Sequence, residues 1–274
     1  MSAAFVAAMA RLARLPDSRC SEPWEWPGHS AWPLQVRDAL YRSLEEELAA
    51  VAAQPAPPSE AGRLLAVGQR AWGELRGLLV GVPDAALDRA PSAQGLWPSP
   101  VGAVAGEPAA WGLDWTLRDA LGHLLLSGRR DREALEYALR RSGSEPLTLQ
   151  PSAALGEAEE AGGAGTWIDR LAAERAVGAE LASATSDQLH RPTLWAGYQV
   201  DVRFSMLRLA GQLVEHTVQA ERILAGTGWE PGEAHLIVRR ISGARGAHEL
   251  FTEGETLGRL DEVHADRAAS LCGS

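Results

Sequence analysis

The chain has 274 residues, of which 46% are hydrophobic and 23% are charged. This is the composition of a globular protein, and it excludes a wholly disordered or collagen-like chain. The formal net charge of −10 disfavours nucleic acids and anionic membrane surfaces, so we expect neither as a partner. All 26 basic residues are arginine, which excludes mechanisms that need a lysine, such as Schiff-base formation.

The cysteines and the first residues of the chain indicate a cytoplasmic protein. Two cysteines, Cys20 and Cys272, are too few for a disulfide scaffold, and we expect both to be free thiols. In the Ala-rich start, Arg11 and Arg14 follow the apolar residues, whereas a signal peptide carries its charges first. No apolar run approaches the ~20 residues of a membrane span.

The first predicted helix covers about residues 33–53 and belongs to an N-terminal extension, residues 1–58. Its predicted inner stripe has helical spacing and consists of Val36, Leu40, Leu44, Leu48 and Val51. Glu45, Glu46 and Glu47 are predicted to face water. The segment from Gln54 to Pro58 is Pro-rich and reads as a stiff linker.

Helical periodicity recurs along the rest of the chain, whereas strand signals are sparse. The further helices are predicted at about residues 59–80, 115–141, 166–185, 202–225 and 231–251. We expect an all-α fold in which residues 59–226 form a four-helix bundle. The polar, Gly-rich segment 142–165 is predicted to cross over without a regular element. Residues 227–274 are predicted to add a helix and a tail, in which residues 252–274 form a short helix and a frayed end.

Two of the seven histidines fall on inward faces of predicted core helices. His123 follows Leu117 and Leu121, His216 follows Leu209 and Leu213, and Gln212 stands one turn before His216. Imidazoles from facing helices are common metal ligands in bundles. The alternative is that each is a core histidine hydrogen-bonded to a carbonyl or a side chain. Gln212 is likewise either a ligand or a structural amide bonded to His216 or to the backbone.

Three segments carry a resemblance to a known family. They are Trp115–Leu124 (WTLRDALGHL), Val82–Pro91 (VPDAALDRAP) and Arg208–Glu221 (RLAGQLVEHTVQAE). The first resembles the second-helix signature of the DinB/YfiT-like family, the second its first interhelical loop, and the third its last core helix. The similarity covers about residues 59–225, and the order and spacing of the three segments agree with the family.

This resemblance implies an up-down-down-up four-helix bundle that forms a homodimer and holds a divalent metal, which is nickel, zinc or iron. His123 matches the first ligand position of the family and His216 the last. Gln212 stands at the middle position, where the family usually has histidine and the mycothiol-dependent maleylpyruvate isomerase branch has glutamate. A neutral amide is a poor ligand for transition metals.

Ten tryptophans stand beside three Phe and three Tyr, which is an unusual ratio. Several are predicted in loops or near helix ends: Trp24, Trp26, Trp32, Trp97, Trp111 and Trp195. They either line an apolar pocket or attach loops to the core. His29 lies in this Trp-rich N-terminal segment, which either supplies a further ligand by folding over the bundle or packs on its exterior.

The sequence therefore leaves two alternative hypotheses for the function. In the first, His123, His216 and Gln212 hold a divalent metal in an enzyme of the thiol-dependent transferase or hydrolase type. In the second, the bundle is metal-free and binds a small molecule or another protein. No nucleophile elbow, dinucleotide-binding loop or Walker motif is present in the sequence to support another chemistry.

Overall fold

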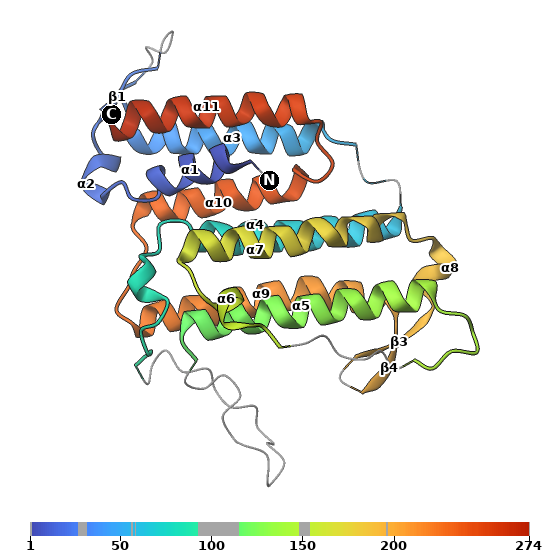
Figure 1. The fold of residues 1–274 in the computed structure, drawn as a ribbon. Coiled ribbons are helices and arrows are strands. Elements are labelled where there is room, and N and C mark those ends of the chain that lie inside the picture. Colours follow the sequence, from blue (N-terminus) through green and yellow to red (C-terminus); the bar gives the residue numbers. More distant parts are fainter. Residues whose placement is uncertain are drawn as a thin grey trace. The chain divides into compact units, whose positions relative to one another are not determined.

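The computed structural model describes residues 2–26, 32–55, 57, 59–92, 115–147, 154–195 and 197–273. The chain is predominantly helical, as predicted, and the strands in this described part form two short antiparallel hairpins (Figure 1). It divides into two compact units. The first unit consists of Met1–Pro58, Ala66–Gly81 and Pro231–Ser274, and the second of Ser59–Leu65 and Val82–Glu230. The two ends of the chain, expected as separate additions, thus share one unit.

The first unit is built from α-helices and one hairpin. Its elements are α1 (Ala3–Leu12), α2 (Asp17–Cys20), β1 (Pro23–Trp24), β2 (Leu34–Gln35), α3 (Val36–Ala53), α10 (Glu233–His248), α11 (Gly254–Cys272) and the later part of α4 (Glu60–Leu79). Helix α10 packs on α3 and α1 packs on α11. Figure 1 shows α3 beside α11, which it also contacts. The short helix predicted after residue 251 is therefore longer than expected, since α11 continues to Cys272 and packs on α1.

Two glycine contacts bring α4 and α10 together within the first unit. A Cβ on Gly73 would lie 2.3 Å from the carbonyl oxygen of Ser242, and one on Gly246 would lie 2.4 Å from that of Gln69. Real Cβ atoms do not come this close to an oxygen. Only glycine therefore allows the two backbones to approach so closely.

The second unit contains the predicted candidate ligands. Its elements are η1 (Asp84–Ala86), α5 (Leu117–Arg140), α6 (Glu157–Glu160), α7 (Ala164–Val177), η3 (Gly178–Ser183), α8 (Ser186–Leu189), β3 (Pro192–Trp195), β4 (Tyr198–Asp201), α9 (Val202–Gly226) and the first residues of α4. Helix α5 packs against α9 and α7. A capping box begins α5: the Asp119 amide donates to Thr116 Oγ1, and the Thr116 amide donates to Asp119 Oδ2.

The orientation of α3 differs from the prediction. Leu48, expected inside, is 50% exposed, whereas Glu47, expected in water, is fully buried. The buried positions after Leu40 are Ser43 and Glu47, so the helix turns its polar residues inward. The carboxylate of Glu47 is compensated there by groups on α10 and α11, which no pattern within α3 reveals.

Several predicted boundaries also differ from the structure. The helix expected at 166–185 begins at Ala164 and gives way at Gly178 to a 3-10 turn, and α6 lies in the crossover 142–165. Trp24 and Trp195, expected in loops, lie in strands that are too short to show alternation. His29, Trp97 and Trp111 lie outside the described residues.

Two simpler expectations concern the thiols and the membrane. Both cysteines are free, and Cys20 is buried in the first unit. Burial raises the pKa of the Cys20 thiol, which makes it less reactive. Among the helices of the described residues, none is both long enough and apolar enough to span a membrane.

Candidate functional site

The second unit brings the two predicted imidazoles together. His123 from α5 and His216 from α9 have ring centroids 5.1 Å apart, with 60° between the ring planes. His216 is 8% exposed, and His123 is half-buried. The ring of Trp115, just before α5, lies 4.9 Å from that of His123. The inward stripes of α5 and α9 therefore converge at these histidines, as the periodicity predicts.

The hydrogen bond of His216 determines its tautomer. Nδ1 of His216 lies 2.8 Å from Oε1 of Gln219, one turn further along α9. An amide oxygen only accepts, so Nδ1 carries the proton and Nε2 of the neutral ring keeps its lone pair. This is the arrangement of a metal-binding histidine whose other nitrogen is held by a neighbouring group.

Both imidazoles are neutral at pH 7. Burial, together with the nearby His216, lowers the pKa of His123 to about 4. Burial also lowers the pKa of His216, although the bond to Gln219 and the charge of Glu215 oppose the shift. Neutral imidazole is the form that binds metal ions.

Gln212 lies beside a carboxylate of the facing helix. It is buried one turn before His216, and its side chain lowers the pKa of Asp131 of α5. Oε1 of Gln212 and Oδ2 of Asp131 are both buried without a hydrogen-bond partner. Burial has the larger effect and raises the pKa of Asp131 to about 6. Asp131, two turns after His123 on α5, was not among the residues predicted from the sequence.

A pocket of about 290 Å³ adjoins His123. Trp115, Asp119 and Leu155 are among the residues that line it. Arg118, another lining residue, pairs with Asp88. The guanidinium of Arg118 also donates to the carbonyl oxygens of Glu160 and Gly162. A pocket of this volume accommodates a small organic molecule beside the imidazole of His123.

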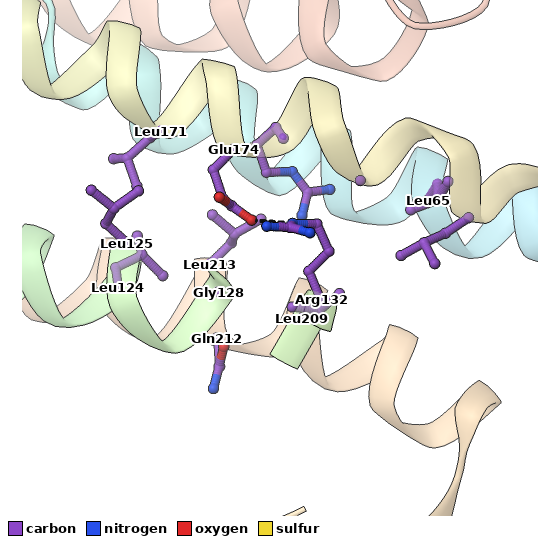
Figure 2. A pocket seen from close by; sticks show the side chains of 13 residues that line it. Leu65, Leu124, Leu125, Gly128, Arg132, Leu171, Glu174, Leu209, Gln212 and Leu213 are labelled. Atoms are coloured by element: carbon purple, nitrogen blue, oxygen red, sulfur yellow. Dashed lines mark hydrogen bonds and ion pairs between the residues drawn. The ribbon is translucent and has the colours of Figure 1, made fainter. Parts of the chain in front are cut away.

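A second, smaller cavity of about 40 Å³ lies between α5, α7, α9 and the start of α4 (Figure 2). Its walls are mostly leucine, including Leu65, Leu124, Leu125, Leu171, Leu209 and Leu213. Three charged side chains also line it: Arg132, Glu174 and Arg175. Figure 2 shows Arg132 of α5 and Glu174 of α7 joined across the leucine-lined space, and the two form a close ion pair.

The donors beside this pocket are two neutral imidazoles, those of His123 and His216. In the part of the chain that the structure describes, no group of three or more His, Cys, Asp and Glu residues is arranged to hold a metal ion. No known family model, curated protein or solved structure matches the chain.

Proposed function

We propose that residues 59–226 form a DinB-like four-helix bundle in which His123 and His216 hold a divalent nickel, zinc or iron ion. The observation that carries this proposal is the pair of neutral imidazoles from facing helices, with centroids 5.1 Å apart. When bound, the metal lowers the pKa of a coordinated water or thiol, so that the nucleophile exists at neutral pH. The reaction class is a hydrolase or a thiol-dependent transferase.

Residues around the two histidines have further roles in this proposal. Gln219 holds the His216 ring in the tautomer that leaves Nε2 free. The pocket beside His123 takes the substrate, and Trp115 offers it an apolar surface. Asp131 of α5, whose pKa is about 6, is ionised for the most part at neutral pH.

The proposal predicts metal binding that depends on both histidines. Tag-free protein prepared without chelator should contain close to one divalent ion per chain by elemental analysis. The double variant His123→Ala, His216→Ala should contain almost none, because both donors are lost. Isothermal titration of metal-free protein with zinc should show the same difference.

The matched control is His190→Ala. His190 is an exposed imidazole of the same unit that lies 3.9 Å from Asp201, so its removal tests for adventitious binding to surface histidines. The control should keep the metal. Equal metal content in the wild type and the double variant would contradict the assignment.

A second candidate function is a metal-free binding module. It is favoured by the neutral amide of Gln212, a poor transition-metal ligand, at the family's middle ligand position. In that case the pocket beside His123 binds a small molecule without metal chemistry. Wild-type protein free of metal, whose thermal stability is unchanged by a chelator, would favour this function.

We further propose a homodimer, formed through an exposed apolar stripe on α9. The stripe consists of Phe204, Leu207, Val214 and Val218, which are 40–54% exposed, and Gly211 in the middle. Its alternating spacing of three and four residues is that of a coiled-coil seam. Arg208 and Glu215 lie along one edge of the stripe and form an ion pair with each other at 2.7 Å. This pair leaves no net charge on that edge to oppose the packing of two copies of the stripe.

If the protein is a homodimer, a variant with charges in the stripe should have a lower mass in solution. The double substitution Leu207→Glu, Val214→Glu places charges in the seam and should convert a dimer to a monomer in multi-angle light scattering. Val177→Glu, at a 52% exposed position on α7 away from the stripe, should remain dimeric. A wild-type protein that is monomeric at micromolar concentration would refute the pairing.

A further inference from the structure

Arg175 is a partly exposed arginine of α7 that lines a cavity of the second unit. It lines the leucine-walled cavity of Figure 2, where its Nε is buried and has no hydrogen-bond partner. No hydrogen bond or ion pair of Arg175 is present among the described residues. Burial lowers the pKa of Arg175 to about 10, against the opposing charge of Glu174, but the side chain is still positive at pH 7.

Glu174, the carboxylate that acts on Arg175, already has other partners. Glu174 forms a close ion pair with Arg132 and lies 3.9 Å from Arg129. Arg132 is also held by Glu136 at 2.7 Å. Two of the three charged side chains that line the cavity are arginines and one is a glutamate, so the lining carries an excess positive charge. A buried charge without a partner is unfavourable unless an anion or water compensates it.

We propose that this cavity is a binding site for a short-chain carboxylate, with the carboxylate paired to Arg175 and the hydrocarbon chain against the leucines. Arginine is suited to this task because its planar N–H groups match the two oxygens of a carboxylate. The leucine walls favour an apolar tail over a hydrated inorganic ion. The site is independent of the metal assigned to His123 and His216.

The size of the cavity restricts the ligand. A volume of about 40 Å³ corresponds to roughly three water molecules. This is the space of an acetate or propionate ion, while longer chains would have to displace the leucines. We therefore expect affinity to be highest for two- and three-carbon carboxylates and to fall for hexanoate.

Titration calorimetry with acetate and propionate tests the proposal in a buffer otherwise free of small anions. Chloride at equal ionic strength and the neutral analogue acetamide are the ligand controls. Wild-type protein should bind both carboxylates, whereas Arg175→Gln should lose binding and Arg175→Lys should bind about tenfold more weakly, because it keeps the charge but not the planar fork. Arg170→Gln, on the same helix but outside the cavity lining, should bind like the wild type.

The stability of Arg175→Gln gives an independent readout. Without added carboxylate this variant should unfold at a temperature no lower than that of the wild type, because it removes a charge that no hydrogen bond or ion pair in the described part of the chain compensates. A clearly lower temperature would mean that the protein itself compensates Arg175, and it would overturn the proposal. So would carboxylate binding that is absent from the wild type or retained by Arg175→Gln. The His123→Ala, His216→Ala variant should keep carboxylate binding, and loss of binding there would assign the carboxylate to the metal and also overturn the Arg175 site.

Discussion

Glu47→Gln is expected to destabilise the protein by about 3–5 kcal/mol, the typical cost of removing one partner from a buried charge network. Glu47 of α3 is 0% exposed. One of its oxygens lies 2.5 Å from Nε2 of His248, and the other lies 2.6 Å from Nε2 of His264 and 3.3 Å from Arg245. Chemical denaturation followed by circular dichroism measures the loss. Glutamine would direct an N–H group at one of these donors.

The contacts of His248 explain why the carboxylate is essential. Nδ1 of His248 lies 2.9 Å from Oγ1 of Thr252, and this hydroxyl donates its proton to the carbonyl oxygen of His248. Nε2 of His248 donates to Oε2 of Glu47, and the buried Arg245 pairs with the other carboxylate oxygen. Removal of the negative charge leaves Arg245 with one counter-ion fewer in the buried network.

The pKa of Glu47 predicts how the stability of the folded protein depends on pH. Burial alone raises the pKa of Glu47, but the hydrogen bonds from His248 and His264 and the charge of Arg245 outweigh it and lower the pKa from 4.5 to about 2. A lowered pKa stabilises the folded state above pH 4.5, and that stabilisation is lost as the pH falls from 4.5 towards 2. The stability of the wild type should fall over this range more steeply than that of Glu47→Gln.

The control for this prediction is Glu45→Gln on the same helix. The Glu45 side chain is 62% exposed and pairs with Arg42, so its loss should cost less than about 1 kcal/mol. If Glu47→Gln were as mild as Glu45→Gln, the network around His248 and His264 would be structurally unimportant.

Glu47 also shows why the sequence did not predict the buried face of α3 correctly. The periodicity of α3 predicts a helix, and it is correct for Val36 and Leu40, which are buried. It fails in the second half of the helix, because an inward-facing carboxylate is distinguishable from a solvated one only when its partners are known. Those partners, His248 and His264, lie about two hundred residues further along the chain.

The candidate site was easier to predict, because its geometry is contained in two strongly periodic helices. His123 and His216 each continue a leucine stripe, and stripes of packed helices face each other. The hydrogen bonds around them were not predictable in the same way. Gln219 and Asp131 lie on the same faces as other polar residues. Periodicity does not indicate that Gln219 bonds to His216 or that Asp131 lies beside Gln212.

Gln212→His is expected to raise the affinity for zinc or nickel by about ten- to a hundredfold. The substitution replaces an amide by an imidazole one turn before His216, at the spacing that places two ligands on one helix face. Asp131 lies beside residue 212, and a carboxylate behind a histidine orients the ring and strengthens it as a ligand. Competition with a chromophoric chelator above neutral pH, where Asp131 is ionised, measures the affinity.

Two matched variants separate the effect from simpler causes. Gln212→Leu removes the amide without adding a donor, so it should leave the affinity near that of the wild type. Gln199→His adds an imidazole at an exposed position of β4 and should bind metal only weakly. If Gln212→His bound no more tightly than these controls, the lone pairs of His123 and His216 would not converge on one ion. The metal-dependent function would then be untenable, and the binding module would take its place.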